Sequence, residues 1–355
     1  MPPLFLIGFM AAGKTSVGKA IARASGRPFI DLDDAVAAMG ESTASLVARD
    51  EAEFRRREAK ALETLIAARE NANAIVATGG GAAASGNNLD KMRAAGLVVA
   101  LGVDVGEAEK RAQGGPLRPL LASAATLATS RAPTYRKAHA VVDTMGRAIS
   151  EVAAAVTAVE RAWLRLPAGQ RDATVVALGD RSYPIIVGAT VDLGVLREHL
   201  AGATKLAVIT DTNVVKHAAV LAPLGAEVIE IPPGEASKSL AVFERLCQDL
   251  VSRGLDRHSA ILALGGGVVG DLAGFVAASL FRGIPVIQLP TTIVAMTDSA
   301  IGGKTAVDLP AGKNLVGAFW QPRLVMCALA TLSQLPARER RAGFGELWKY
   351  ALLDG

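Results

Sequence analysis

The stretch Gly8-Phe9-Met10-Ala11-Ala12-Gly13-Lys14-Thr15 decides the fold of the first half of the chain. It has the spacing of a phosphate-binding loop and lies between an apolar run, residues 4–9, and a helical pattern, residues 14–24. In such loops backbone N–H groups and the helix N-terminus face nucleotide phosphates, the lysine reaches the outer phosphates, and the threonine hydroxyl can hold Mg²⁺. A chance glycine-rich turn is the alternative. The pattern predicts a nucleotide site at Ala11, Ala12, Gly13, Lys14, Thr15 and Ser16.

The rest of the chain predicts two α/β domains. Apolar runs without alternation, which are typical of buried parallel strands, alternate with helical patterns. The expected strands are residues 28–33, 74–78, 97–103, 140–143, 206–210, 228–231, 260–264 and 286–289, and the long helices are 44–69 and 149–166. Pro167-Ala168-Gly169-Gln170-Arg171-Asp172 breaks the pattern. We therefore expect domains at 1–166 and 173–355, joined by a linker at 167–172.

Composition and charge favour a globular protein that binds small anions. Of 355 residues, 51% are hydrophobic and 20% are charged, and the formal net charge is +4. The basic residues are spread along the chain without interleaved aromatics, which argues against a nucleic-acid partner. Cys247 and Cys327 have no metal-ligand spacing, which indicates reduced thiols. The chain lacks a signal-peptide pattern and any apolar run long enough for a membrane span, so we expect a cytoplasmic protein.

Two carboxylates stand at the end of the second apolar run, in Phe29-Ile30-Asp31-Leu32-Asp33-Asp34. This is the carboxyl edge of a parallel sheet, where ligands bind in open α/β folds. Alternate residues of an extended segment point the same way, so Asp31 and Asp33 are expected to face the phosphate-binding loop together. One would help to position Mg²⁺, and the other would bind and deprotonate an acceptor hydroxyl. The alternative is a helix N-cap, provided by Asp33 or Asp34.

Four more motifs follow in order. They are Glu53-Phe54-Arg55-Arg56-Arg57-Glu58, Thr78-Gly79-Gly80-Gly81, Leu117-Arg118-Pro119-Leu120-Leu121 and Arg131-Ala132-Pro133-Thr134-Tyr135. Taken singly, an arginine on a charged helix is usually part of a solvated face. Together with the loop, these motifs resemble the shikimate kinase family across residues 3–165. The resemblance implies a P-loop kinase domain with a parallel sheet, which uses ATP and Mg²⁺ to phosphorylate the 3-hydroxyl of shikimate.

The resemblance also implies roles for individual residues. Asp33, Arg55, Gly80 and Arg131 match shikimate-binding positions, with Asp33 as the catalytic base and the arginines on the carboxylate. Lys14 and Arg118 match catalytic positions that stabilise phosphoryl charge, and Arg118 and Arg147 match ATP contacts. Thr15 and Asp31 match the Mg²⁺ side of the site. Only nine residues separate Leu121 from Arg131, so the resemblance implies a short lid in this chain.

A second glycine-rich turn, Leu264-Gly265-Gly266-Gly267-Val268-Val269-Gly270-Asp271, follows an apolar run and opens a helical pattern. Alone it is weak evidence for a dinucleotide site, because tight packing or a phosphate contact explains it equally well. It belongs to an ordered series with Asp211-Thr212-Asn213, Pro233-Gly234-Glu235-Ala236-Ser237-Lys238, Pro290-Thr291-Thr292, Thr297-Asp298-Ser299, Gly302-Gly303-Lys304, Gly312-Lys313-Asn314 and Gly345-Glu346-Leu347-Trp348-Lys349-Tyr350. From about residue 172 to the end, this series resembles the 3-dehydroquinate synthase family.

This second resemblance implies a Rossmann-like α/β domain that binds NAD and converts 3-deoxy-arabino-heptulosonate 7-phosphate to 3-dehydroquinate. The positions it matches to NAD are Asp211, Asn213, Glu235, Lys238, Gly267, Val268, Val269, Gly270, Asp271, Thr291, Thr292, Lys304 and Lys313. Those it matches to the sugar-acid phosphate are Asp298, Arg282, Lys313, Asn314 and Lys349. Lys304 and Lys349 match catalytic positions. Lysines suit a ligand with a phosphate and a carboxylate.

Glu346 matches the one carboxylate ligand of a catalytic Zn²⁺ in that family. The resemblance places the two histidine ligands further along, in a C-terminal helical domain, whereas all four histidines here precede Glu346. We therefore expect the synthase domain to be incomplete in this chain and its activity lost, as in a fragment of a longer fusion enzyme. Loss of a covering domain would also expose apolar surface and favour a homo-oligomer.

Two alternatives remain open. The second half could be a non-catalytic NAD-binding, regulatory or oligomerisation module, although this does not explain why Lys304, Lys313, Asn314, Glu346 and Lys349 occur together. The first half could be another small-molecule kinase on the same scaffold, because fold alone does not define the acceptor.

Overall fold

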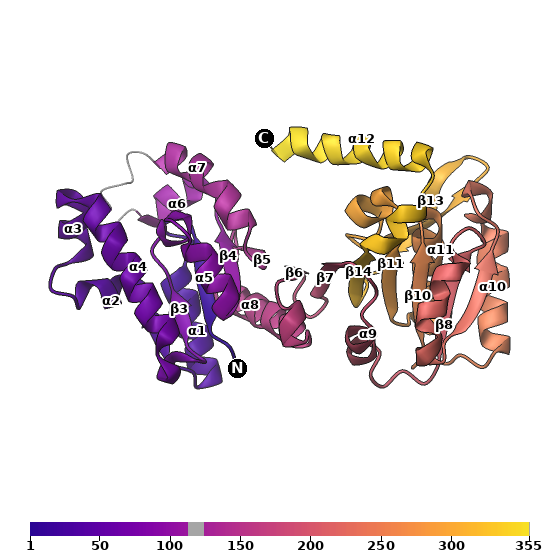
Figure 1. Ribbon diagram of the computed structural model, residues 1–355, viewed down its shortest axis with the longest axis horizontal. Helices are drawn as coiled ribbons and strands as arrows, with labels where there is room; N and C mark the ends of the chain where they lie inside the picture. The colour runs from indigo at the N-terminus through magenta and orange to yellow at the C-terminus, as the bar shows by residue number, and fades with distance from the viewer. Residues whose placement is uncertain (113–123, 355) are drawn as a thin grey trace. The chain divides into compact units, whose positions relative to one another are not determined.

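The chain forms two compact units in the computed structural model, which describes residues 1–112 and 124–354 (Figure 1). Unit 1 comprises Met1–Leu164 with Arg171–Ser182, and unit 2 comprises Arg165–Gln170 with Tyr183–Gly355. The sequence domains at 1–166 and 173–355 and the linker between them stay a prediction. No helix within the described residues is both long and apolar enough to cross a membrane.

Unit 1 is built on a five-stranded parallel sheet, which confirms the predicted α/β class. The strand order is β2-β3-β1-β4-β5. The strands are β1 (Leu4–Gly8), β2 (Phe29–Asp31), β3 (Ile75–Ala77), β4 (Leu97–Gly102) and β5 (Ala140–Asp143). The α-helices are α1 (Lys14–Ser25), α2 (Leu32–Ala37), α3 (Thr43–Arg49), α4 (Glu51–Ala67), α5 (Asn88–Ala95), α6 (Val105–Ala112), α7 (Ala124–Arg136) and α8 (Ile149–Leu164). Phe54, Leu62 and Met92 of α4 and α5 pack with Phe5 and Val98 in one core, which fixes α4 against the sheet.

The helix predicted over residues 44–69 is two helices, α3 and α4, so that prediction was wrong. Asp50 between them has an extended backbone, with φ −157° and ψ 94°. Its Oδ1 accepts a hydrogen bond from Glu53 N at 2.9 Å. An aspartate N-cap starts a new helix because it satisfies an N–H group that the first turn leaves unpaired. The apolar periodicity continues across Asp50 and hides the break.

The second strand is shorter than predicted. It ends at Asp31, and α2 begins at the next residue, so Asp33 lies in the first helical turn and not on the strand. The N-cap is Asp31, whose Oδ1 accepts from Asp33 N at 3.1 Å. The expectation that Asp31 and Asp33 share one side of an extended segment was therefore wrong, and neither Asp33 nor Asp34 is the cap.

The segment 171–176 folds onto unit 1. Trp163 Nε1 in α8 donates to the carbonyl oxygen of Arg171 at 2.7 Å, and the Arg171 guanidinium lies 5.0 Å from the Trp163 ring centre. Val175 N, in the short strand β6 (Thr174–Val176), donates to His139 O at 2.7 Å. These contacts help to enclose His139, whose side chain is fully buried.

Burial, helped by the neighbouring Arg93 cation, lowers the pKa of His139 from 6.5 to about 4. Its Nδ1 accepts from Val98 N at 2.9 Å, so the neutral ring carries its proton on Nε2. The folded state resists protonation, whereas the unfolded chain takes up a proton near pH 6.5. Stability is therefore lost as pH falls from 6.5 towards 4, by about 3 kcal/mol for this shift.

Replacement of His139 by asparagine is expected to flatten this part of the pH dependence, because asparagine keeps an acceptor for Val98 N but does not titrate. Urea unfolding followed by Trp163 fluorescence, in a background with Trp320 and Trp348 replaced by phenylalanine, measures the difference. The same steepness between pH 6.5 and 4.5 in both proteins would contradict the prediction.

Unit 2 has a second parallel sheet, in which six of its strands run in the order β7-β14-β11-β10-β8-β9. The strands are β7 (Tyr183–Gly188), β8 (Leu206–Asp211), β9 (Glu227–Ile231), β10 (Ala260–Gly265), β11 (Val286–Pro290) and β14 (Leu324–Ala328). The α-helices are α9 (Leu193–His199), α10 (Leu240–Ser252), α11 (Gly267–Ser279) and α12 (Ala337–Asp354). An antiparallel hairpin, β12 (Lys304–Leu309) and β13 (Gly312–Phe319), was not predicted.

Candidate functional sites

The phosphate-binding loop connects the carboxyl end of β1 to α1. Gly13 precedes the helix with φ 91°, a left-handed conformation that glycine adopts at little cost, and Ala11 also has a positive φ of 58°. Lys14 Nζ donates to the carbonyl oxygens of Gly8 at 2.9 Å and Phe9 at 2.8 Å. The lysine thus lies over its own loop, where it is positioned to meet phosphate oxygens.

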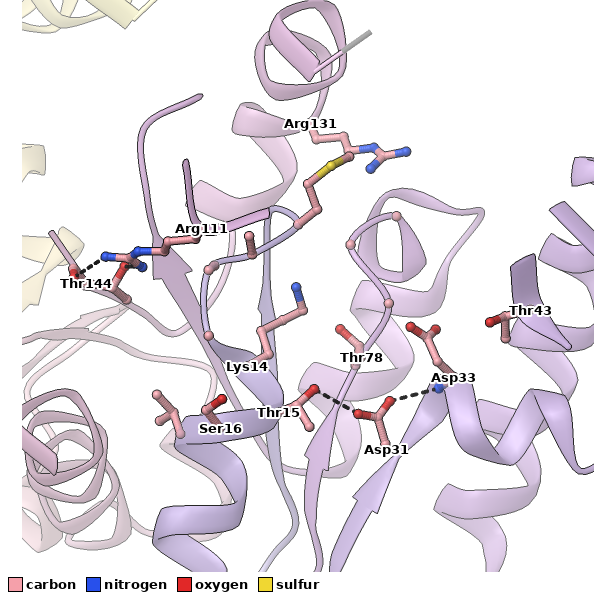
Figure 2. A pocket seen from close by; sticks show the side chains of 18 of the residues that line it. Lys14, Thr15, Ser16, Asp31, Asp33, Thr43, Thr78, Arg111, Arg131 and Thr144 are labelled. Carbon is pink, nitrogen blue, oxygen red and sulfur yellow. Dashed lines mark hydrogen bonds between the residues drawn. The ribbon is translucent and has the colours of Figure 1, made fainter. Parts of the chain in front are cut away.

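A cavity of about 930 Å³ surrounds this loop. Apart from Arg118, which lies outside the described residues, it gathers every residue predicted for the ATP, Mg²⁺ and shikimate sites: Ala11, Ala12, Gly13, Lys14, Thr15, Ser16, Asp31, Asp33, Arg55, Gly80, Arg131 and Arg147. Figure 2 shows Arg111 and Thr144 on one side of the loop and Asp33 on the other, with Lys14 and Thr15 between them. The cavity therefore has two ends that meet at Lys14.

Thr15 and Asp31 fit a bound Mg²⁺. Thr15 Oγ1 donates to Asp31 Oδ2 at 2.8 Å, so a hydroxyl oxygen and a carboxylate oxygen already lie together beside the loop (Figure 2). Mg²⁺ prefers hard oxygen ligands and usually takes only one or two from the protein, the rest being water and phosphate. The donor set matches this requirement.

At the Asp33 end, carboxylates and arginine form a close group. Arg55 Nη1 donates to Glu58 Oε2 at 2.8 Å, and Arg55 Nη2 donates to Glu51 Oε1 at 3.1 Å. Glu58 is fully buried, and its Oε1 has no hydrogen-bond partner within the described residues. A Cβ atom on Gly79 would lie 2.6 Å from Glu58 Oε1 and 2.8 Å from Asp33 Oδ1. Glycine at position 79 therefore leaves room for two carboxyl groups close together.

A second arginine completes this end. Arg131 of α7 is buried, with 8% of its surface exposed, and lines the cavity. In the same helix, Tyr135 Oη donates to Gly80 O at 2.5 Å, which ties α7 to the glycine-rich turn. Arg55, Arg131 and Lys14 give this end three cations, an arrangement that favours an anionic ligand.

Burial and the neighbouring charges shift the pKa values of two carboxyl groups at this end of the cavity. Burial raises the pKa of Asp33, the charge of Asp31 raises it further, and the Lys14 and Arg55 cations oppose the rise. Burial also raises the pKa of Glu58, against the lowering effect of Arg55. Asp33 thus holds its proton more readily than an exposed aspartate, which suits a residue that accepts a proton during a reaction.

The other end of the cavity includes residues that the sequence analysis missed. Arg111 of α6 donates from Nη1 to Thr144 Oγ1 and from Nη2 to Thr144 O, both at 3.0 Å, and from Nε to Glu107 Oε1 at 2.8 Å. Arg147, which was predicted, donates to Asp143 O at 3.0 Å. The only sequence signal for Arg111 was that α6 directly follows the carboxyl end of β4. A charged helical pair otherwise looks like a solvated face.

In unit 2 the carboxyl edge of the sheet carries a cavity of about 230 Å³. Its walls come from the ends of β10, β11 and β14, with Leu264, Leu289, Pro290 and Met326, and from Thr331. None of these residues was named as a ligand contact in the sequence analysis. A mainly apolar slot at the carboxyl edge of a parallel sheet suits a flat ring.

Three buried hydroxyls lie near the same edge. Thr210 Oγ1 is at the end of β8, Thr291 Oγ1 directly follows β11, and Ser299 Oγ lies 3.2 Å from the position that a Cβ on Gly267 would take. None of the three has a hydrogen-bond partner within the described residues. Buried polar atoms are normally paired, so this edge fits a polar ligand that follows the glycine-rich turn, such as a dinucleotide.

Three residues predicted to bind NAD or substrate form a polar cluster around the buried Lys238. Lys238 Nζ donates to Asp271 Oδ2 at 2.5 Å and also to Asn314 Oδ1. Burial raises the pKa of Asp271, while Lys238 lowers it. Beside this cluster, the exposed Lys313 pairs with Glu235 at 3.1 Å. The hairpin thus brings Lys313 and Asn314 to residues 75 or more positions earlier in the chain.

Among the other predicted residues of unit 2, Val269 and Gly270 are buried in α11, and most of the charged ones are exposed or half-buried. Asp211 Oδ1 accepts from Asn213 N at 2.9 Å, and Asp298 Oδ1 accepts from Tyr350 Oη at 3.2 Å. Lys304 and Arg282 are exposed. On α12, Lys349 donates to Glu346.

The described residues do not form a zinc site. Glu346 is paired with Lys349, and the described part of the chain contains no group of three or more His, Cys, Asp or Glu side chains suited to a metal ion. Zinc sites of this kind need three protein ligands. The residues present therefore do not fit the metal that the resemblance implies.

The fold and the candidate site of each unit are typical of a different class of protein. Unit 1 is a P-loop α/β unit with an anion-binding end, and unit 2 is an α/β unit of the dinucleotide-binding type. Residues 10–160 match the family model for shikimate kinase, and residues 228–342 match that for the 3-dehydroquinate synthase N-terminal domain. Residues 10–160 are thus similar to shikimate kinases and residues 228–342 to the N-terminal domain of 3-dehydroquinate synthases, two enzyme families of the shikimate pathway.

Individual relatives and solved structures match parts of the chain. The 3-dehydroquinate synthase of Symbiobacterium thermophilum is 50% identical over 186 residues, which cover 50% of this chain and 52% of the relative. The chain spans about half the length of the curated relatives that it matches. Among solved structures, shikimate kinase from Acinetobacter baumannii in complex with shikimate is 29% identical, with a TM-score of 0.43, covering 45% of this chain and 93% of that one. A 2-deoxy-scyllo-inosose synthase complexed with carbaglucose-6-phosphate, NAD+ and Co2+ is 32% identical, with a TM-score of 0.46, covering 50% of each chain.

Proposed function

We propose that unit 1 transfers the γ-phosphoryl group of ATP to the 3-hydroxyl of shikimate. The observation that carries the proposal is the single cavity with the phosphate-binding loop at its middle and Asp33, Arg55 and Arg131 at one end. Shikimate offers a carboxylate for the two arginines and ring hydroxyls for Asp33. The opposite end, with Arg111 and Arg147, is left for the adenosine part of ATP.

In this arrangement Asp33 accepts the proton of the 3-hydroxyl as its oxygen attacks the γ-phosphorus and ADP leaves. Lys14 and the backbone N–H groups of the loop stabilise the charge on the transferred group. Thr15 and Asp31 would hold Mg²⁺, which supplies further neutralisation of phosphate charge when bound. Arg118 is proposed as a second phosphoryl-stabilising cation, on the family resemblance alone.

The test is ADP formation by the full chain with ATP and Mg²⁺, with and without shikimate. Stimulation by shikimate, and none by quinate or another hydroxylated carboxylic acid, supports the proposal. ATP binding without any stimulation by shikimate would mean that another acceptor is used.

For unit 2 we propose the NAD- and substrate-binding part of a 3-dehydroquinate synthase site. The hydroxyls of Thr210, Thr291 and Ser299 beside the glycine-rich turn, which have no hydrogen-bond partner among the described residues, support NAD binding, and NAD would supply a transient oxidation of the substrate ring. Asp298, Lys313, Asn314 and Lys349 are proposed to take the phosphorylated sugar acid. A calorimetric titration tests both ligands: binding of NAD but not of a phosphorylated sugar-acid analogue would favour a non-catalytic NAD-binding module. A cytoplasmic location and self-association stay predictions.

Replacement of Glu58 by glutamine is expected to lower kcat/KM for shikimate about tenfold, mainly through KM, because Arg55 loses its buried anionic partner. The KM for ATP should not change, since Glu58 lies at the Asp33 end. The matched control is Glu51→Gln, which removes the exposed partner of the same arginine and should change kcat/KM by no more than about twofold. If both variants lowered kcat/KM for shikimate by the same factor, the burial of Glu58 would not matter for Arg55.

A further inference from the structure

Four threonines line the cavity of unit 1, and three of them have their hydroxyls committed to the protein. Thr15 donates to Asp31, Thr78 donates to Leu6 O at 3.1 Å, and Thr144 donates to Gly102 O at 2.8 Å. The fourth is Thr43, whose hydroxyl makes no hydrogen bond to the described residues. Its side chain is half-buried. A hydroxyl of this kind, on the wall of a ligand cavity, is available to a ligand.

The other residues of α3 that line the cavity, Ala44 and Val47, are apolar. Thr43, Leu46 and Val47 fall on one face of α3 because their spacing is that of neighbours along a helix. Leu46 is fully buried in the core, and Val47 packs against the same core while it lines the cavity. Phe54 of α4 lines the cavity as well. The part of the lining formed by Val47 of α3 and Phe54 of α4 is therefore apolar and suits the face of a carbon ring, with the Thr43 hydroxyl at its edge.

Thr43 also lies at the correct end of the cavity. Figure 2 shows it beyond Asp33, away from Lys14 and the nucleotide end, with its hydroxyl turned to the side on which Asp33 lies. In the proposed function, Asp33 takes the hydroxyl that is phosphorylated, and Arg55 and Arg131 take the carboxylate. A ring held at these points presents its remaining hydroxyls to a different wall of the cavity.

We propose that Thr43 is a specificity-determining residue of the kinase, and that its hydroxyl bonds a ring hydroxyl of the acceptor other than the one that receives the phosphoryl group. The inference rests on the proposed function, which assigns no residue to the ring hydroxyls that are not phosphorylated. Loss of one neutral hydrogen bond between a side chain and a substrate corresponds to about a three- to tenfold fall in kcat/KM.

The test compares the full chain with its Thr43→Val and Thr43→Ser variants on shikimate, 4-deoxyshikimate and 5-deoxyshikimate. Valine keeps the branched shape without the hydroxyl, and serine keeps the hydroxyl. We expect Thr43→Val to lower kcat/KM for shikimate about three- to tenfold and Thr43→Ser to retain most of it. One of the two deoxy analogues lacks the hydroxyl that bonds Thr43. For that analogue, the wild-type chain and Thr43→Val should have the same kcat/KM.

If Thr43→Val lowered kcat/KM by the same factor for shikimate and for both analogues, the inference would be overturned, because valine would then act only through packing. Unchanged kcat/KM for shikimate in Thr43→Val would overturn it as well. The KM for ATP and the unfolding midpoint of each variant identify a folding defect, which would lower activity towards every acceptor. Absence of shikimate-dependent turnover in the wild-type chain would overturn the proposed kinase function itself. This outcome differs from an active wild-type enzyme whose Thr43→Val variant loses kcat/KM equally for all acceptors.

Discussion

Replacement of Asp33 by asparagine is expected to lower kcat for shikimate phosphorylation by a factor of about 10² to 10⁴ while ATP still binds. Asparagine keeps the shape of the side chain and one acceptor oxygen but does not take up a proton at neutral pH. Lys14, Thr15 and the rest of the loop are untouched, so nucleotide affinity should be preserved. The measurement is ADP formation with saturating ATP, together with nucleotide binding by titration.

The matched control for this variant is Asp34→Asn. Asp34 is the next residue in the same helical turn, but it is exposed and does not line the cavity. Its substitution should leave kcat within about twofold of wild type, as expected for a surface charge. If the two variants lost activity to the same degree, the base would have to be another group.

A pH profile adds a second test of Asp33. Its pKa is raised mainly by burial and then by Asp31, with a smaller contribution from Asp34. A base must be ionised to act, so kcat/KM should fall as the pH drops through a pKa higher than that of an exposed aspartate. Removal of the Asp34 charge should move this acid limb to lower pH. A shift to higher pH would contradict the assignment.

The phosphate-binding loop was predictable because its function depends on local backbone geometry. Glycine at position 13 and lysine and threonine at 14 and 15 are required by the loop itself, whatever packs around it. The buried strands were predictable for a similar reason, since parallel strands covered on both faces contain uninterrupted apolar runs. These features are decided within about ten residues of sequence.

Other parts of the site depend on contacts between distant segments. Glu58 looks like one more charge on a polar helix, and only the approach of Gly79 reveals that it is buried beside Asp33. Arg111 likewise looks solvated until Thr144, 33 residues later, accepts its hydrogen bonds. The break at Asp50 was hidden because the capping contact is made by one side chain within a continuous apolar periodicity. The sequence pattern contains no direct signal for such contacts.

In unit 2 the glycine-rich turn was evident, whereas the polar cluster behind it was not. Lys238 follows a short 3₁₀ turn, Asp271 lies on α11, and Asn314 lies on a hairpin that the sequence analysis did not predict. The family resemblance named all three residues as ligand contacts. The structure adds that Lys238 is 5% exposed and pairs with both partners, so these residues also connect the hairpin to α11.

Replacement of Lys238 by methionine is therefore expected to destabilise unit 2 by about 3 kcal/mol, since removal of one partner leaves the buried Asp271 carboxylate without its cation. Asp271→Asn should cost a similar amount because it leaves the buried lysine without a carboxylate partner. The double variant should lose less than the sum of the two, as the charges are removed together. The exposed pair of Glu235 and Lys313 provides the control, with an expected cost below about 1 kcal/mol for Lys313→Met.

The pH dependence of Lys238→Met separates charge burial from a loss of packing. The pKa of Asp271 is already raised by burial, and without Lys238 it should rise further. A carboxyl group whose folded-state pKa is raised destabilises the fold fully above that pKa, and this destabilisation declines as the pH falls towards the unfolded-state pKa, below which both states hold the proton. The defect of Lys238→Met should therefore be larger at pH 8 than at pH 5, when measured by amide hydrogen exchange of peptides from β10 and α11. A defect that stayed constant with pH would mean that the aliphatic stem of Lys238, and not its charge, holds the hairpin in place.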